Sequence, residues 1–474
     1  MKLAFQLAWE HRARWMAMLV LTAVSGAVLV LGLHSAIGYE LAMELQHIDM
    51  GSTPIDVMVS LVATFLIVQS IAALCLESQA RDLAVIKTCG ASTKALRRTL
   101  MAEVFAVTSL GFVLGLAAAV FVIDPYVSGS VWEQSEFRIP AIGVHMSAVL
   151  NAYIILIIAV FVGAWSTLKH VSRQNVVNAL QGDTVTTHRR SKVLRWILAV
   201  LCVLTMAGLF LLMNNLDALI EAFKDAPREV RGQLLGMPML SGVVFCLLAL
   251  TLLVTVAPNL YQALLGQITK RLPKRAPAGL QVGFNLARYN AAKYAGSITP
   301  IIVFITVVIM IFTTMDASSA MIFTQLESMG IDTSAMEGTN YAGITYIIGP
   351  AVLIAVTGSL CTIVMSGRNR IYVNKLAGII GADRRERLKL ALLEMAGYIA
   401  LAAIISCGIM LLAAALVMIG NTKLSGIQQA FIPSWGWWLG AVVVSFLFML
   451  GPAIHAVRRA NRLESKAVLE TFGE

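Results

Sequence analysis

Apolar stretches of roughly 20 residues recur along the whole chain, and each is long enough to cross a bilayer core of about 30 Å. Hydrophobic residues occupy 58% of the 474 positions and charged residues only 13%, against about 25% charged residues in soluble domains. These values exclude a soluble protein and predict an all-α, polytopic membrane protein. We expect ten transmembrane helices, at residues 15–37, 57–78, 101–123, 147–168, 193–213, 238–261, 297–315, 345–365, 390–418 and 436–457.

Basic residues gather on one side of these spans. The side of the N-terminus holds 31 of the 36 lysines and arginines, and the opposite loops hold 5. By the positive-inside rule, both termini are expected in the cytoplasm, and the protein in a plasma (inner) membrane. The net charge of +10 does not indicate a nucleic-acid partner, because the basic residues line a membrane surface. The opposite loops have 17 to 29 residues, too few for a folded outer domain of about 50 residues or more.

The segment between the second and third spans, ESQARDLAVIKTCGASTKALRRTLMAE, predicts a helix, a tight turn and a second helix. Gly90 stands where a helix C-cap requires a positive φ, and Ser92 stands where the next helix requires an N-cap oxygen. Such a charged corner would be displayed to the cytoplasm, where it suits contact with a soluble partner. A single segment of this kind could equally well be an ordinary basic loop whose charge only follows the positive-inside rule.

A second corner follows the eighth span, in the segment SGRNRIYVNKLAGIIGADRRERLKLALLE. Here Gly381 is the expected turn residue and Asp383 the expected N-cap, with Glu386 three positions later as a capping box requires. Glu394 lies 13 positions after Gly381, the spacing that also separates Gly90 from Glu103 in the first corner. The shared cap chemistry and spacing indicate an internal repeat.

The repeat extends past the corners, since 103 positions separate Glu77 from Leu180 and also Ser366 from Leu469. We therefore expect three parts: a four-helix unit with an N-terminal amphipathic helix at 1–182, two connecting transmembrane helices at 183–277, and a second four-helix unit at 278–474. Equivalent helices of the two units are six spans apart in the chain. Because six is even, the two units are expected to be parallel and related by an axis along the membrane normal.

The run DLAVIKTCGAS, from Asp82 to Ser92, resembles the pattern of FtsX-like permeases, the membrane subunits of type VII (MacB-like) ABC transporters. In that family an acidic, apolar, small, apolar, apolar, basic run precedes Gly-Ala-Ser between the second and third helices of a four-helix unit. The second corner departs from the pattern by one extra residue before Gly381 and by Asp383 in place of the serine. The ten-span form resembles BceB-type permeases, here without their large extracellular domain.

This resemblance implies that each corner is a coupling helix seated on an ATP-binding subunit. Two corners imply two copies of a separate ABC ATPase, which would bind ATP and Mg, whereas this chain would bind no cofactor. The implied ATPase-coupling residues are Arg81, Asp82, Ile86, Lys87, Gly90, Ala91 and Ser92 in the first corner, and Arg370, Lys375, Gly381, Ala382 and Asp383 in the second.

The chain shows no catalytic or metal-binding pattern of its own. A P-loop requires a Gly-Lys pair to hold phosphates, and no such pair occurs. No HExxH or paired His/Cys cluster suggests a metal site, and the six cysteines lack CxxC spacing, so we expect small core residues instead. The chain is therefore expected to be a non-enzymatic membrane subunit.

Glu103 and Glu394 are expected about three turns into the helices that follow the corners, near the inner membrane interface. Each could pair with a basic residue of a neighbouring helix, because an ionisable group at membrane depth is costly unless partnered. A carboxylate that reaches back to the headgroups is an equally good interpretation. Gly111 and Gly115 form a GxxxG pattern that predicts close helix packing, and His34 is expected to make an interhelical hydrogen bond.

Three functions fit these features. The first is a permease subunit that exports or extracts an amphiphilic substrate, such as a lipid, lipopeptide or antimicrobial peptide, within the lipid bilayer. The second is a mechanotransmission subunit that drives an extracellular or sensor partner without transport. The third, an ion-coupled carrier, is disfavoured because no carboxylate is expected deep within a span.

Overall fold

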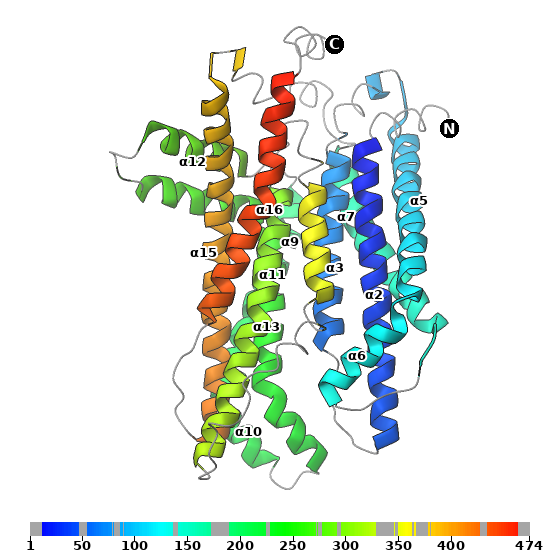
Figure 1. Ribbon diagram of the computed structural model, residues 1–474, viewed down its shortest axis with the longest axis vertical. Coiled ribbons are helices and arrows are strands. Elements are labelled where there is room, and N and C mark those ends of the chain that lie inside the picture. The colour runs from blue at the N-terminus through cyan, green and yellow to red at the C-terminus, as the bar shows by residue number, and fades with distance from the viewer. Residues whose placement is uncertain are drawn as a thin grey trace.

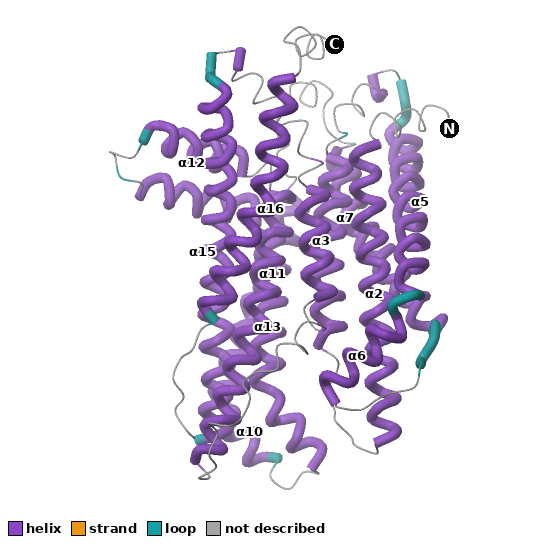
Figure 2. Tube along the Cα trace, viewed as in Figure 1, coloured by secondary structure: helices purple, strands orange, loops and turns teal. Residues whose placement is uncertain are grey.

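The computed structural model describes residues 12–46, 55–77, 79, 86–88, 90–135, 141–171, 189–223, 228–271, 273, 277–291, 295–328, 346, 349–362, 365, 378–379, 381–426 and 434–462. These residues form helices joined by turns and short loops, and no strand occurs among them. Figure 2 shows the long helices running roughly parallel to the long axis of the molecule, with shorter helices such as α12 (Ala278–Ala291) lying across it. The predicted all-α class is therefore confirmed.

The first part of the chain forms a bundle of four long helices. These are α2 (Arg12–Gln46), α3 (Ile55–Glu77), α5 (Thr93–Val120) and α7 (Met146–Val171). Helix α2 packs against the other three, and α3 and α5 also pack against α7. The shorter α6 (Ile123–Ser135) follows α5 and lies across α2 at the end of the bundle away from the corners (Figure 1).

The second bundle contains α13 (Ala295–Ser328), α15 (Arg384–Ser425) and α16 (Trp435–Arg462). The shorter helix at 349–362 lies between α13 and α15 in the chain and packs against α3. Helix α13 packs against α15 and α16, and α15 packs against α16. These pairings correspond to those of α2 with α5 and α7, and of α5 with α7, in the first bundle. The repeat itself stays a prediction, and the tails on which its full length rests lie outside the described residues.

The connecting segment packs mainly on the second bundle. It consists of α9 (Arg189–Asn214), α10 (Leu216–Ala222) and α11 (Arg228–Arg271). Helix α11 contacts α13 and α15, and α9 contacts α11 and α15. The amphipathic helix α12 (Ala278–Ala291) lies across the long helices and contacts α15 and α11 (Figure 1).

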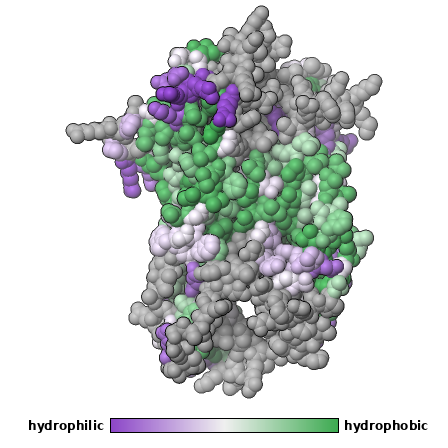
Figure 3. Space-filling view, in the orientation of Figure 1, coloured by the Kyte–Doolittle hydropathy of each residue, from purple (hydrophilic) through white to green (hydrophobic). Residues whose placement is uncertain are grey.

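Among the described residues, eight helical segments are long and apolar enough to span a membrane. An apolar belt crosses the middle of the molecule (Figure 3). The segments are Arg14–Ala42, Val57–Leu76, Thr93–Val120, Met146–Lys169, Trp196–Asn214, Gly236–Ala257, Ile298–Met321 and Arg384–Ser425. The other two expected spans coincide with the shorter apolar helices Gly349–Thr362 and Trp435–Gly451. The chain is therefore a multi-pass membrane protein, and the count of ten spans stays a prediction.

Two helices of the second bundle are longer than the expected spans. Helix α13 has 34 residues and α15 has 42. At 1.5 Å per residue they measure about 51 and 63 Å, well beyond a hydrocarbon core of about 30 Å. Residues 316–328 and 419–425, expected in loops, therefore continue these helices.

Polar contacts tie these helix extensions together. The Asn421 side-chain amide donates to the carbonyl of Ala317 at 3.1 Å, the Ser434 hydroxyl donates to Asp316 at 2.6 Å, and Lys423 pairs with Asp217 of α10 at 2.6 Å.

Close packing of α2 on α5 confirms the interpretation of the GxxxG pattern. A Cβ added at Gly111 would meet the Thr22 side chain, and one added at Gly115 would meet the Ala23 carbonyl. The backbones of the two helices can therefore approach only because these positions carry no side chain.

The other polar and thiol groups behave as expected. The ring of His34 is fully buried, its Nδ1–H donates to Val30 at 2.7 Å, and its Nε2 accepts from the His145 backbone N–H at 2.9 Å. This bond links α2 to the start of α7, as predicted. The five described cysteines are free thiols, and Cys89 lies outside the described residues.

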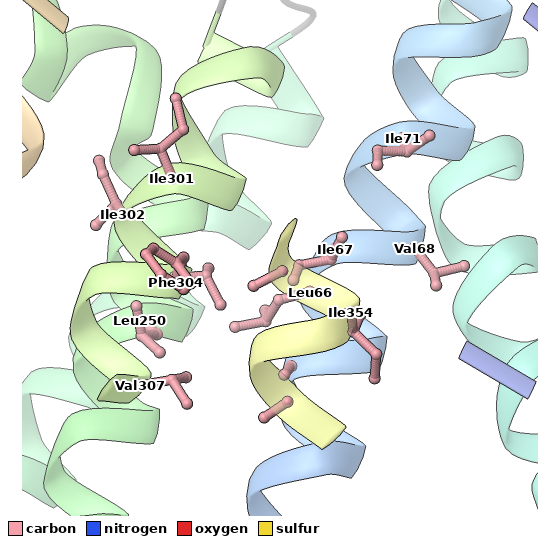
Figure 4. Packing of buried hydrophobic residues seen from close by; sticks show 14 of the residues in the cluster. Leu66, Ile67, Val68, Ile71, Leu250, Ile301, Ile302, Phe304, Val307 and Ile354 are labelled. Carbon is pink, nitrogen blue, oxygen red and sulfur yellow. The ribbon is translucent and has the colours of Figure 1, made fainter. Parts of the chain in front are cut away.

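The two bundles meet along α3. Figure 4 shows Leu66 and Ile67 of α3 between Phe304 of α13 and Ile354 of the helix at 349–362. The helix at 349–362 also reaches α2, where the Cys361 thiol donates to the Ala17 carbonyl at 3.1 Å. Helix α3 thus contacts α13, and the helix at 349–362 contacts α2.

Candidate functional site

The first corner has the local geometry that its sequence predicts. Residues Ile86, Lys87 and Thr88 form a helical turn, and the backbone N–H of Gly90 donates to the Lys87 carbonyl at 3.1 Å. The next N–H, from Ala91, donates to the Ile86 carbonyl at 3.4 Å. Gly90 has a φ of 91°, which residues with a Cβ adopt only at a cost. The chain can therefore reverse here within a few residues.

Ser92 begins the helix that follows the first corner. Its backbone is extended, with φ −69° and ψ 140°, and its hydroxyl accepts the N–H of Ala95 at 3.2 Å. This bond satisfies one of the N–H groups that the first turn of a helix leaves unpaired. The predicted N-cap is confirmed, and α5 begins at Thr93, eight residues before the expected span.

The second corner also has a glycine turn followed by a side-chain N-cap, made by different residues. Gly381 has a φ of 103°, and its N–H donates to the Gly378 carbonyl at 3.2 Å. The Asp383 carboxylate accepts the Arg384 N–H at 2.7 Å, and the Glu386 carboxylate accepts the Asp383 N–H at 3.2 Å. This arrangement is the predicted capping box.

Both corners lie at one end of the molecule, the end at which α2 begins and α16 ends (Figure 1). Their turn residues Gly90, Ser92, Gly381 and Asp383 are exposed, whereas Ile86, Lys87, Ala91 and Ala382 are half-buried. The predicted coupling residues Arg81, Asp82, Arg370 and Lys375 lie outside the described residues.

Basic side chains surround the starts of the two helices that leave the corners. Lys94, Arg97 and Arg98 follow the first corner, and Arg384, Arg385, Arg387 and Lys389 follow the second. The first turn of α5 contains no acidic residue, and that of α15 contains only Glu386. Cations at a helix N-terminus oppose the macrodipole. Each corner is therefore a basic, polar surface that an acidic partner surface would stabilise.

Glu394 lies about three turns into α15, where its carboxylate is buried and accepts a hydrogen bond from the Tyr398 hydroxyl at 2.7 Å. Glu103 has the same position in α5 and is half-buried. Both interpretations of Glu103, an ion pair with a neighbouring helix and a carboxylate that reaches back to the headgroups, stay predictions.

The packing of α12 on α15 beside Glu394 was not expected from the sequence. A Cβ at Gly283 would fall 2.5 Å from the Leu393 side chain, and one at Gly397 would fall 3.0 Å from Ala287. Gly279 also faces Leu393. The glycine pair four residues apart in α12 was the signal for this contact. This glycine contact holds α12 against the part of α15 that carries Glu394.

The described part of the site consists of exposed turns and the starts of two helices. Among the described residues, no group of three or more His, Cys, Asp or Glu side chains is arranged to hold a metal ion. What the geometry provides is two exposed turns, each continuous with a long helix that crosses the molecule.

Comparison with known families gives one match. Residues 55–176 match the family described as FtsX-like permease C-terminal. This range covers α3, the first corner, α5, α6 and α7. No curated protein matches the chain.

Proposed function

We propose that this protein is the membrane permease subunit of an ABC-type transporter of the type VII (MacB-like) group, and that a separate ATPase dimer drives it. The observation that carries the proposal is the pair of capped corners at one end of the molecule, the first of them inside the FtsX-like match. Each corner would seat on one ATPase subunit, which binds ATP and Mg.

Charge supports this assignment of the corners. The basic residues at the starts of α5 and α15 are destabilised by the helix macrodipole, and acidic groups on an ATPase would offset that cost. Side-chain bonds to the backbone hold both turns, so a partner would bind a preformed surface. Preformed surfaces lose less conformational entropy on binding.

The helices that leave the corners provide the mechanical link. ATP binding would close the ATPase dimer and draw the two corners together. Helix α5 packs along α2, and α15 packs along α13, so movement of a corner would move its whole bundle. The two bundles would then rock against each other where α3 meets α13 and the helix at 349–362.

The substrate that we propose is amphiphilic: a lipid, lipopeptide or antimicrobial peptide drawn from the plasma membrane. An apolar belt crosses the surface of the molecule, where lipid would surround it. ATPase stimulation by such amphiphiles in reconstituted bilayers is the expected result. Absence of stimulation by all three classes would count against the transport role.

Charge reversal at the first corner tests the proposal. Replacing Arg81 and Lys87 by glutamate should abolish co-purification of the ATPase while leaving membrane insertion intact, because repulsion would replace attraction at the contact. The matched control replaces Lys270 and Arg271, at the end of α11, by glutamate. Co-purification that persists in the corner variant as in the control would refute the coupling role.

A second candidate function is mechanotransmission to a partner on the outer side. The length of α15 favours it, because one continuous helix runs from the second corner to the opposite end of the molecule. An outer-side partner that co-purifies with the complex, combined with ATPase activity that no amphiphile changes, would support this function over transport.

A further inference from the structure

Three buried hydroxyl groups near the contact between the bundles have no hydrogen-bond partner: those of Ser25 on α2 and of Ser60 and Thr64 on α3. Other hydroxyls nearby bond to the carbonyl of the preceding turn: those of Thr22 on α2, Ser70 on α3 and Ser359 on the helix at 349–362, at 2.7 to 3.0 Å. A buried hydroxyl without a partner loses its bonds to water and gains none in exchange. The three groups therefore suggest a second state in which they are hydrated.

Helix geometry places Ser25 and Thr64 at the same level. Where α2 meets α3, a Cβ at Gly32 would lie 3.9 Å from the Cα of Val57. Ser25 is seven residues before Gly32, and Thr64 is seven residues after Val57. Seven residues are about two turns, so each returns to the face of its helix that makes this contact. Because the two helices are antiparallel, Ser25 and Thr64 both lie about two turns from the Gly32–Val57 contact, in the same direction along the bundle.

The face of α3 that carries the hydroxyls also faces the other bundle. Ser60, Thr64, Ile67 and Ile71 follow one another at spacings of three and four residues, which align on one side of a helix. A Cβ at Gly358 would meet Ile67 and lie 3.5 Å from Ile71. The hydroxyls thus line a seam between α2, α3 and the helix at 349–362, where the two bundles join.

A pair of tyrosines closes the outer end of this seam. The Tyr126 hydroxyl of α6 donates to the Tyr346 carbonyl at 2.9 Å, and the two rings lie 5.9 Å apart. A Cβ at Gly129 would fall 2.6 Å from the Tyr346 hydroxyl, so only glycine leaves room for that ring. Tyr346 precedes the helix at 349–362 by three residues. This contact, which we call the tyrosine latch, joins the two bundles.

We propose that the seam parts during the ATPase cycle, and that Ser25, Ser60 and Thr64 then line a hydrated groove that binds the polar head of an amphiphile. The tyrosine latch closes the groove in the state described here. Apolar tails stay in the surrounding lipid, while the hydroxyls form hydrogen bonds with the head group. This inference rests on the proposed function, since ATP-driven rocking opens the seam.

Thiol labelling tests the groove. Ser60→Cys and Thr64→Cys are placed singly in a full-length chain whose six native cysteines are replaced by alanine, and studied in lipid nanodiscs with the ATPase. A charged methanethiosulfonate reagent should label both positions much faster during ATP turnover than without nucleotide. The control is Ala159→Cys, which is buried one turn from Gly163, where α7 meets α3 within one bundle. It should stay unlabelled throughout.

A second variant tests the latch without the ATPase. Tyr126→Phe keeps the ring but removes the hydrogen bond to Tyr346, which should raise the labelling rate at Ser60→Cys about fivefold, the factor that corresponds to about 1 kcal/mol. This measurement needs no ATPase. It therefore tests the groove even if the proposed pairing of the protein with an ATPase is wrong. No labelling at either position in any condition would overturn the inference. Equal labelling at Ala159→Cys would also overturn it, because it would indicate general loosening.

Competition tests the head-group site. Octyl glucoside below its micellar concentration, an amphiphile with a hydroxyl-rich head, should slow labelling of Ser60→Cys during ATP turnover. Labelling of Thr88→Cys, at the exposed first corner, should not change. Equal rates at Ser60→Cys with and without the amphiphile would refute binding of a head group in the groove.

Discussion

Gly90 and Gly381 adopt φ values of 91° and 103°, and a Cβ at either position would meet no atom within 4 Å. Their role is therefore conformational rather than steric. A side chain would fit in the space around each turn, but the backbone would be strained, most strongly for a β-branched residue. Two single residues thus determine whether the exposed turns can form.

Gly90→Val should weaken co-purification of the ATPase without reducing membrane insertion, because a strained φ of this kind costs about 1–3 kcal/mol and disfavours the turn. Pull-down of the ATPase from solubilised membranes measures the effect. Gly208→Val in α9 is the matched control, since that glycine also has no atom within 4 Å of an added Cβ and no positive φ. Equal recovery of the ATPase with both variants would contradict the prediction.

At the scale of the helix, α5 and α15 share one design. Each begins at a side-chain cap beside an exposed turn, carries a carboxylate about three turns later, and packs along the first helix of its bundle. The caps differ in chemistry: Ser92 makes one bond to the helix backbone, whereas Asp383 and Glu386 form a reciprocal pair. The first turn of α15 is therefore held by more bonds than that of α5.

Asp383→Ala should destabilise the first turn of α15 by about 1 kcal/mol, the usual cost of losing an N-cap side chain. Faster amide hydrogen exchange at residues 384–387 is the expected readout. Ser92→Ala serves as the reciprocal control and should speed exchange at the start of α5 only. Unchanged exchange at 384–387 in Asp383→Ala would show that packing, rather than the cap, holds this end of the helix.

At the scale of the whole molecule, both corners lie at one end and α6 and α10 lie at the other (Figure 1). An apolar belt separates the two ends (Figure 3). From the distribution of basic residues, the positive-inside rule predicts that the corner end faces the cytoplasm. Every proposal about an ATPase depends on this assignment, because ATP is available only on that side.

An impermeant thiol reagent applied to intact cells should label Ser128→Cys, on the exposed surface of α6, and spare Thr88→Cys at the first corner. Both variants are made in a chain without native cysteines. After the cells are opened, Thr88→Cys should react as well, which provides the internal control for reactivity. Labelling of Thr88→Cys in intact cells would place the corners outside and exclude a cytoplasmic partner there.

The sequence by itself determined the features that depend on local or one-dimensional physics. Segment length and hydropathy identify membrane helices, because lipid requires every backbone hydrogen bond to be made within the helix. Charge asymmetry predicts orientation. Cap residues such as Ser92 and Asp383 were identified correctly, because a cap involves only neighbours along the chain. The GxxxG pair Gly111 and Gly115 likewise predicted a close helix contact, which the structure contains.

Only the tertiary structure decided which helices meet. Apolar side chains that face lipid and apolar side chains that face another helix look alike in sequence, since lipid tails are as apolar as leucine. The sequence therefore could not place α3 between the bundles, the connecting helices on the second bundle, or Tyr346 against Tyr126. The unpartnered hydroxyls of Ser25, Ser60 and Thr64 became recognisable only when packing showed what surrounds them.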